Sequence, residues 1–416
     1  MQSPEQAFEA WGSYDQDDPY PLFAEVRERG ALHEVTLVDG HDAWLVTRHD
    51  EAKALLNDPR LSKDLQAALA SSEGIVAEGL PGPDFARHML VVDPPDHTRL
   101  RRLVSAAFSV RRIEGLRPRV QAIIDDLLDG IAAQGPDARV DLVASFAFPL
   151  PFTVICELLG VPEPERAPFG RALGALSMPT STPAEYERAK AGSDAVVRSL
   201  TQLVETKQAD PGDDLVSALI NTRDGTDCLD QRELLSTILQ LIIAGHDTTT
   251  SLIGNSVVAL LRHPEQLAAL RANPDEIAGA VEELLRYDSP VPHATFRYAT
   301  EPVEMAGVTI PAGAQVIICL AASNRDADCA VDSETLDLER GNSHHIAFGH
   351  GIHFCLGAAL ARMEGQLALR SLLLRFPQLR LAAPGEELHW GHGDGLVLRG
   401  LIELPVIPGP AEQPTP

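Results

Sequence analysis

The sequence lacks the long apolar run that a membrane-spanning helix requires. Its most apolar stretches, FAFPLPFTVICELL and LLSTILQLIIAG, are interrupted by Pro, Glu or Gln and fall short of the roughly 20 residues needed. The opening MQSPEQAFEAWGSYDQDD is acidic and polar, unlike a secretory signal peptide. We therefore expect no membrane association and a cytoplasmic location.

Basic residues are scarce as well. The chain has 34 Lys and Arg against 60 Asp and Glu, so its formal net charge is −26. Such a chain repels nucleic acid and anionic membrane, and the charge favours solubility. These counts argue against a nucleic-acid-binding function, and we expect a monomer.

Cysteine is sparse and irregularly spaced. An odd number of scattered cysteines fits a reducing compartment better than a disulfide framework. We expect four of the five to carry no chemistry. The five are Cys156, Cys228, Cys319, Cys329 and Cys355.

Helical periodicity dominates what is present. The stretch ALHEVTLVDGHDAWLVTRH predicts two strands joined at Asp39-Gly40, and VEMAGVTIPAGAQVIICL predicts a second strand pair. Most of the remainder has apolar residues at helical spacing. The pattern predicts a mainly α-helical fold with a small β region, in a single domain over residues 1–416 that ends in a flexible tail from about 407.

One predicted helix has an unusual centre. Asp230 and Glu233 form a candidate capping box, and the helix then continues to about Arg262, on the order of 45 Å. Its middle reads AGHDTTT, from Ala244 to Thr250, where a buried helix would normally carry large apolar residues. We interpret this as either a tolerated kink or a helix thinned so that a ligand can lie against it.

The stretch FGHGIHFCLG, from Phe348 to Gly357, concentrates histidine, cysteine and glycine near the end of the chain. A nucleophilic cysteine would need a base and oxyanion donors, and only His353 is near in sequence. A thiolate ligand to haem iron explains the glycines, which permit a tight turn and a close approach to a flat ring. A zinc site is a third alternative, with the candidate ligands His345, His350, His353 and Cys355. A purely structural loop is the fourth, but it would need no cysteine.

This stretch resembles the signature of the cytochrome P450 family, Phe-Gly-x-Gly-x-His-x-Cys-x-Gly, at every fixed position. The resemblance implies the cytochrome P450 fold with haem b bound through Cys355, next to Phe348, Gly349 and Gly357. It also implies that Glu283 and Arg286, in the order Glu-x-x-Arg, form a structural pair closed by Arg340. Four cations would contact the haem propionates: His97, Arg101, Arg297 and His353.

Other segments also resemble the family. Ala244 to Thr249 resembles its oxygen-activating motif, which implies that Ala244 and Gly245 border the haem and that Asp247 and Thr248 control proton delivery. By the same resemblance, eight residues would line an apolar substrate pocket: Gln240, Ile243, Ala244, Val291, His293, Ala294, Val397 and Leu398. Within it we expect His293 to be the polar contact for the substrate. Residues 71–90 and 171–189 would form its roof.

The resemblance implies a monooxygenase that inserts one atom of O2 into a C–H bond of an apolar small molecule, such as a steroid, a macrolide or a small aromatic. Electrons would come from a ferredoxin and an NAD(P)H-dependent ferredoxin reductase. A peroxide-driven peroxygenase and a non-catalytic haem-binding sensor or carrier remain alternatives. We interpret a group of arginines as a docking patch for the acidic electron carrier: Arg99, Arg102, Arg111, Arg112 and Arg362.

Overall fold

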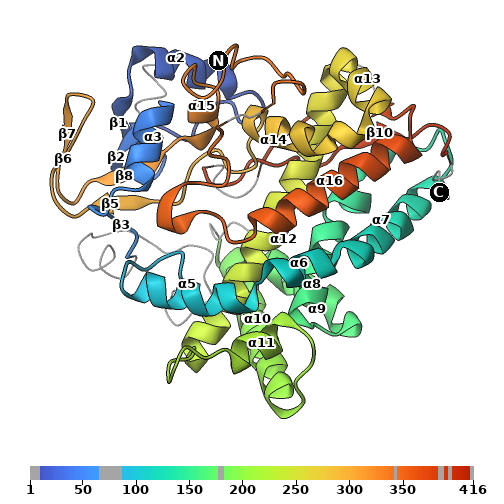
Figure 1. Cartoon of the computed structure of the whole chain (residues 1–416), viewed down its shortest axis with the longest axis horizontal. Helices are drawn as coiled ribbons and strands as arrows, with labels where there is room; N and C mark the ends of the chain where they lie inside the picture. Colours follow the sequence, from blue (N-terminus) through green and yellow to red (C-terminus); the bar gives the residue numbers. More distant parts are fainter. Residues whose placement is uncertain are drawn as a thin grey trace. The chain divides into compact units, whose positions relative to one another are not determined.

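The computed structural model describes residues 10–64, 87–176, 182–341, 344–382, 388–391 and 396–412 (Figure 1). It divides into two compact units. Unit 1 comprises Met1–Leu61, Leu116–Pro151 and Asp247–Pro416, and unit 2 comprises Ser62–Gly115 and Phe152–His246. The mainly helical fold with a small β region that the sequence predicts is confirmed.

The larger sheet of the protein has the strand order β1-β2-β8-β5-β3. Strands β1 (Leu32–Thr36) and β2 (Asp42–Val46) form the predicted antiparallel hairpin, because Gly40 adopts the positive φ of 86° that the turn requires. Strand β8 (Gln315–Ile318) pairs parallel with β2, and β5 (Arg297–Ala299) pairs antiparallel with β8. The edge strand β3 is Leu61–Ser62.

Two smaller sheets belong to unit 1. Strands β6 (Val303–Met305) and β7 (Val308–Ile310) form an antiparallel pair, which confirms the second predicted strand pair. Strand β10 (Pro405–Ile407) lies between β4 (Val140–Asp141) and β9 (Arg380–Leu381). The C-terminal segment thus closes a sheet with strands from two earlier parts of the chain.

The sheet of unit 1 is packed between two apolar clusters because successive side chains of a strand point to opposite faces. In β2, Leu45 contributes to a cluster with Trp11 and Phe23, while Val46 contributes to a cluster with Leu55. Strand β8 follows the same alternation. The helical elements confined to unit 1 are α2 (Tyr20–Arg29), α3 (His49–Leu56), α7 (Arg117–Ala132), η2 (Val143–Ala147), α13 (Pro264–Ala272), η3 (Pro274–Glu276), α14 (Ile277–Tyr287), α15 (Leu320–Asn324), η4 (Gly351–His353) and α16 (Ala358–Arg375).

Unit 2 is built from helices. Helices α9 and α10 pack closely, since a Cβ at Gly192 would lie only 2.6 Å from Cβ of Ala175. The helices confined to this unit are α5 (Asp96–Ala107), α6 (Val110–Gly115), α9 (Glu163–Leu176), α10 (Pro183–Ala209) and α11 (Leu215–Asn221). Helices α8 (Pro149–Leu159) and α12 (Gln231–Arg262) each contribute residues to both units.

Helix α12 begins where the sequence predicts. The backbone N–H of Glu233 donates to Asp230 Oδ1 at 2.8 Å, and the N–H of Asp230 donates to Glu233 Oε2 at 3.0 Å. These reciprocal bonds satisfy donors that a helix start otherwise leaves unpaired. The helix then continues without interruption to Arg262, so the AGHDTTT segment does not break it.

The C-terminal segment is hydrogen-bonded further than expected. Beyond β10, the N–H of Gly409 donates to the carbonyl of Pro136 at 3.0 Å, and the N–H of Glu412 donates to the carbonyl of Arg375 at 2.9 Å. Residues 413–416 lie outside the described residues.

Among the described residues, no single helix has both the length and the apolar character needed to cross a membrane. One bent pair, Val143–Leu159 with Glu163–Ala175, passes the length and composition criteria together, with a bend of 118°.

Candidate functional site

Cys355 differs from the other cysteines in its exposure. Cys156, Cys319 and Cys329 are buried, and burial raises the pKa of their thiols to about 12, 12 and 11 respectively. These three thiols are therefore protonated at neutral pH and chemically inert. Cys355 is exposed, at the end of the glycine-rich loop that precedes α16. Cys228 is partly buried, so Cys355 is the most exposed of the five cysteines and the one best placed to meet a ligand.

The loop before Cys355 is shaped by its glycines. Gly349 and Gly351 have φ angles of 73° and 74°, a left-handed conformation that strains other residues. A Cβ at Gly351 would lie 2.8 Å from Asn57 Oδ1 and 3.1 Å from the carbonyl oxygen of Leu56, so α3 also leaves no room for one. The N–H of Cys355 donates to the carbonyl of Phe348 at 2.9 Å and closes the loop.

Gly357 has a different role. A Cβ there would lie 3.9 Å from Cys355 Sγ, an ordinary contact distance, so the glycine leaves the side of the sulfur uncovered. Helix α16 begins at the next residue, Ala358. The sequence prediction of a tight loop that presents Cys355 at the start of a helix is confirmed.

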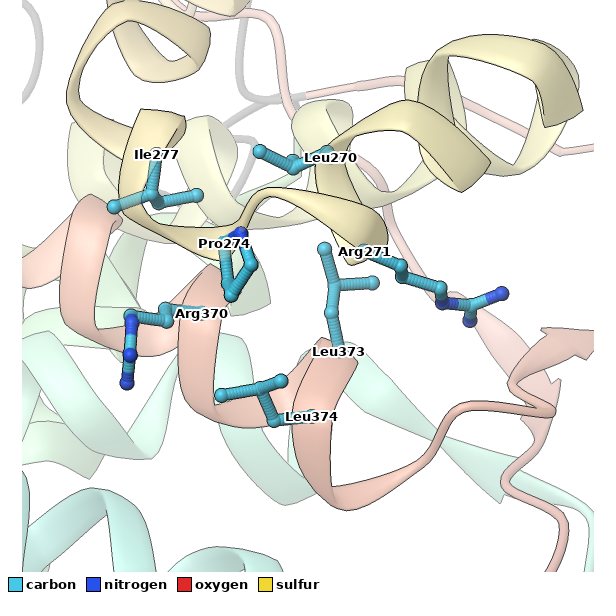
Figure 2. Close-up of a pocket in the computed structure, with 7 residues that line it drawn as sticks. All are labelled: Leu270, Arg271, Pro274, Ile277, Arg370, Leu373 and Leu374. Atoms are coloured by element: carbon cyan, nitrogen blue, oxygen red, sulfur yellow. The ribbon is translucent and has the colours of Figure 1, made fainter. Parts of the chain in front are cut away.

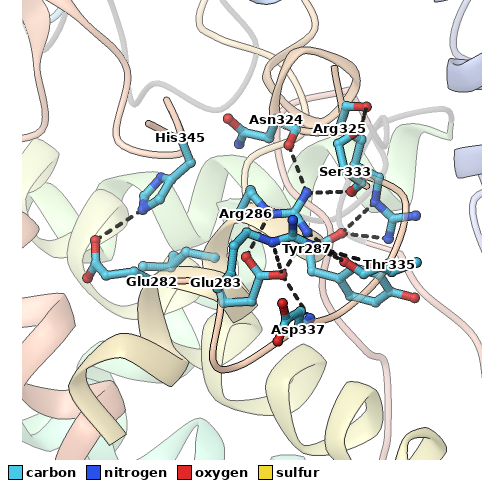
Figure 3. Close-up of polar contacts among 12 residues, drawn as sticks. Glu282, Glu283, Arg286, Tyr287, Asn324, Arg325, Ser333, Thr335, Asp337 and His345 are labelled. Atoms are coloured by element: carbon cyan, nitrogen blue, oxygen red, sulfur yellow. Dashed lines mark hydrogen bonds and ion pairs between the residues drawn. The ribbon is translucent and has the colours of Figure 1, made fainter. Parts of the chain in front are cut away.

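Helix α14 carries a buried ion-pair network (Figure 3). Arg286 donates to both carboxylate oxygens of Glu283, at 2.7 and 2.8 Å, and Arg340 Nε donates to Glu283 Oε1 at 3.1 Å. Arg340 thus occupies the position that the resemblance to the family assigns to it. The remaining donors of Arg286 satisfy three carbonyls of the following loop, those of Asn324, Ser333 and Thr335.

The centre of α12 carries small side chains on one face. Ala244 is exposed although most of its neighbours along the helix are buried. His246 is buried in unit 2, where its Nδ1 lies 2.7 Å from the carbonyl of Ile242 and its ring contacts Phe152 edge-on. Asp247 and Thr248 are partly exposed, whereas Thr249 and Thr250 are buried. The exposed Ala244 fits a helix against which a ligand lies.

Comparison with known proteins decides the family. The family model described as Cytochrome P450 matches residues 174–383. Cytochrome P450 107B1 from Saccharopolyspora erythraea is 46% identical over 396 residues, which cover 94% of this chain and 95% of that protein. A vitamin D(3) 25-hydroxylase from Pseudonocardia autotrophica is 43% identical over 395 residues, 94% of each. The chain belongs to the cytochrome P450 family.

Solved structures agree. The cytochrome P450 PksS of the bacillaene polyketide synthase from Bacillus subtilis 168 superposes with a TM-score of 0.86 at 35% identity, covering 98% of this chain and 100% of that one. Because curated relatives with this degree of similarity are monooxygenases and hydroxylases, the protein is a cytochrome P450 monooxygenase, an oxidoreductase.

The four predicted propionate partners divide evenly between the units. In unit 2, His97 is buried on α5, and its pKa is lowered by desolvation and by the nearby charge of Arg101. In unit 1, Arg297 is buried on β5 and donates to the carbonyl of Thr295 at 2.9 Å, while His353 is partly exposed in η4. One histidine and one arginine of the predicted set thus belong to each unit.

One expectation about the pocket is corrected. His293 is fully buried: its Nε2 accepts from Trp11 Nε1 at 3.2 Å, and its Nδ1 lies 2.8 Å from the carbonyl of Leu396. With both ring nitrogens engaged in a core cluster, it is not the polar substrate contact we expected. Gly245 lies close to α8, since a Cβ there would be 3.3 Å from Ile155 Cδ1.

The sequence analysis placed Gln240 in the pocket but did not identify it as a polar contact for the substrate. Its Oε1 is buried without a hydrogen-bond partner among the described residues, and Gln240 lies one turn before Ala244 on α12. The remaining lining residues vary in exposure: Ile243, Val291, Val397 and Leu398 are partly exposed and Ala294 is buried. Of the predicted roof, residues 71–86 and 177–181 lie outside the described residues, while 171–176 belong to α9 and 183–189 to α10.

Four of the five arginines of the predicted docking patch, all but Arg111, form ion pairs. Such pairs reduce the field that a partner would meet. The pairs are Arg99 with Asp227 and Glu233, Arg102 with Asp224, Arg112 with Asp213, and Arg362 with Glu282.

A small open crevice lies elsewhere in unit 1, where η3 and α14 face the end of α16 (Figure 2). Its apolar side chains point inward, while the guanidinium groups of Arg271 and Arg370 extend away from its centre. It contains none of the predicted site residues. Among the residues that the structure describes, no group of three or more His, Cys, Asp or Glu is placed to hold a metal ion.

Proposed function

We propose that the Cys355 thiolate binds the iron of haem b and that the enzyme inserts one atom of O2 into a C–H bond of an apolar small molecule. Electrons are supplied by a ferredoxin and its NAD(P)H-dependent reductase. The observation that carries this proposal is the exposed Cys355 thiol, held by a glycine-shaped loop in a chain of the cytochrome P450 family.

The residues present fit a haem. A single exposed sulfur with glycine on both sides suits a flat macrocycle better than a tetrahedral metal site. Haem brings two carboxylates that need cationic partners when they are buried. His97, Arg101, Arg297 and His353 would supply them. When bound, the thiolate-ligated haem supplies the oxygen-activating chemistry.

Asp247 and Thr248 control protons in this proposal. A carboxylate followed by a hydroxyl on the same helix can pass a proton from water toward the site, and each is partly exposed here. Asp247→Asn should lower O2-dependent turnover about 100-fold, the lower end of what proton transfer by a positioned side chain contributes. Turnover driven by hydrogen peroxide, which needs no such relay, should stay within about twofold of wild type on the same grounds. Equal losses in both assays would contradict the assignment.

The substrate is apolar with one hydrogen-bond donor. Most candidate lining residues are aliphatic, and the curated relative named for vitamin D3 hydroxylation supports an apolar substrate class. The buried, unpartnered Gln240 Oε1 offers an acceptor. Gln240→Leu should weaken the binding of a hydroxylated substrate about tenfold, because one hydrogen bond is worth about 1 kcal/mol net. The binding of the deoxy analogue should not change. Dissociation constants from haem absorbance titrations measure both.

The decisive test is spectroscopic. Reduced wild-type protein under carbon monoxide should show the absorption band typical of thiolate-bound haem, and Cys355→His should move it to the position of imidazole-bound haem. Cys228→Ser, at a half-buried cysteine in unit 2, is the matched control and should leave the band in place. A wild-type band at the imidazole position, or no retained haem, would refute the proposal. Product formation with a surrogate ferredoxin pair then separates the monooxygenase from a sensor or carrier.

A further inference from the structure

Glu282, which precedes Glu283 on α14, holds an arginine of α16. Arg362 donates from Nε to Glu282 Oε1 at 2.7 Å and from Nη2 to Oε2 at 2.8 Å, a bidentate pair. His345 Nε2 lies 3.1 Å from the same carboxylate, with its side chain only 4% exposed (Figure 3). The pKa of Glu282 is held at about 2, because hydrogen bonds from His345 and Arg362 outweigh its burial.

The guanidinium group also stacks on an aromatic ring. Arg362 Cζ lies 4.5 Å from the centroid of Phe348, the first residue of the cysteine loop. The ring of His345 lies 6.2 Å from the same ring on another side, and Phe354 lies 6.3 Å away. Since the carbonyl of Phe348 accepts the N–H of Cys355, any displacement of Phe348 reaches the backbone of the cysteine.

Arg362 is also within electrostatic range of the sulfur. Its pKa is raised first by the hydrogen bonds that it donates to Glu282, and the charge on Cys355 raises it further. The guanidinium therefore interacts with the Glu282 carboxylate directly and with the sulfur through its charge. It is one-third exposed, so the interaction is only partly screened by solvent.

We propose that the Glu282–Arg362 ion pair is a charge-balanced clamp that positions Phe348 beside the Cys355 loop and sets the midpoint potential of the haem bound there. Arg362 and Glu282 are positioning residues in this role. The inference rests on the proposed binding of haem through Cys355.

The sign of each effect follows from electrostatics. A positive charge near the thiolate stabilises the reduced haem, which carries one more electron, and a negative charge does the reverse. Glu282→Gln leaves Arg362 uncompensated and raises the midpoint potential. Arg362→Gln leaves Glu282 uncompensated and lowers it. The double variant removes both charges and should return the potential close to the wild-type value.

The test is spectroelectrochemical titration of the holoenzyme without substrate. At the wild-type midpoint, the ferrous-to-ferric ratio should rise about fivefold in Glu282→Gln and fall about fivefold in Arg362→Gln. Arg362→Lys retains the charge and should stay within about twofold. The matched control is Arg370→Gln, a change to an exposed arginine two turns further along α16 that pairs with Asp275 at 3.6 Å, and it should leave the ratio unchanged.

The outcomes separate the two claims. A wild-type protein without the thiolate-type carbon monoxide band would overturn the proposed function and this inference with it. With that band present, unchanged potentials in both single variants, or shifts in the same direction, would overturn the clamp alone. If ferredoxin affinity changes while the potentials do not, Arg362 is a docking residue and the clamp is again overturned. Opposite shifts that cancel in the double variant support it.

Discussion

Two buried carboxylates on neighbouring helices have opposite surroundings. Glu283 on α14 is 2% exposed and accepts bonds from Arg286, Arg340 and the N–H of Asp337. Glu364 on α16 is 1% exposed, and its Oε2 has no hydrogen-bond partner in the part of the chain that the structure describes. Burial raises the pKa of Glu364 to about 8, so this carboxyl is largely protonated at neutral pH.

The difference shows two ways in which a fold tolerates a buried acid. Glu283 remains a structural anion because two guanidinium groups surround it, and its network anchors the loop that carries Ser333 and Thr335. Glu364 is accommodated as a neutral acid among apolar side chains of α16 such as Leu360 and Ala368. The network on α14 is therefore needed for folding, whereas Glu364 limits stability as the pH rises.

Breaking the α14 network should have the largest effect. Arg286→Met leaves Glu283 with fewer partners and removes a donor from three carbonyls, of which only that of Thr335 keeps a bond from Arg340. The change should cost about 3–5 kcal/mol of unfolding free energy. That is a large share of the stability of a typical protein. We expect little folded protein, measured as haem-containing yield and as the urea midpoint. The control is Arg370→Met, a change at an exposed residue of α16. Equal yields of the two variants would contradict the prediction.

Replacing Glu364 should raise the unfolding free energy at higher pH, whereas Arg286→Met lowers it. Its folded-state pKa of about 8 lies above the ordinary value of 4.5, so between these values the unfolded chain has released a proton that the folded chain keeps. Wild-type stability therefore falls as pH rises through this window, by about 3–4 kcal/mol between pH 5 and pH 8, and this loss is absent in Glu364→Gln. Urea unfolding of both proteins at roughly pH 5, 6.5 and 8 measures this loss of stability. Parallel stability curves would contradict it.

The contrast between these acids marks the limit of sequence reasoning here. Glu283, Arg286 and the Cys355 loop could be predicted because each belongs to a short pattern whose residues act together locally. Glu364 looks like any helix residue in the sequence, and only its packing reveals that it is buried with one carboxyl oxygen, Oε2, unpartnered among the described residues. The sequence indicated its helix but not its environment.

The errors at the predicted pocket have the same cause. His293 was expected to face a substrate, yet it hydrogen-bonds Trp11, which is 282 positions away in the sequence. The pairing of Glu282 with Arg362 likewise joins residues 80 positions apart. Contacts across such distances depend on tertiary packing, which local periodicity does not encode.

Removing the second guanidinium from Glu283 should have an intermediate effect. Arg340→Gln leaves the bidentate Glu283–Arg286 pair intact and removes one charged hydrogen bond of 3.1 Å. Because hydrogen bonds to charged groups are worth about 1.5–3 kcal/mol, and Gln can still satisfy some carbonyls, we expect a loss of about 1–2 kcal/mol. The urea midpoint should fall between those of wild type and Arg286→Met. A loss equal to that of Arg286→Met would mean that the network acts as one unit.

The smallest effect on stability should come from replacing Glu282, which precedes Glu283 in the sequence. Glu282 is 28% exposed and Arg362 is 33% exposed, so their ion pair is partly solvated although it is bidentate. Pairs of this kind contribute about 0–1 kcal/mol, and we expect Glu282→Gln to lower the unfolding free energy by less than about 1 kcal/mol at neutral pH. Urea unfolding at pH 7, with Glu276→Gln on exposed η3 as the control, measures the difference. A loss comparable to that of Arg286→Met would show that the outer side of α14 carries as much of the folding energy as its buried side.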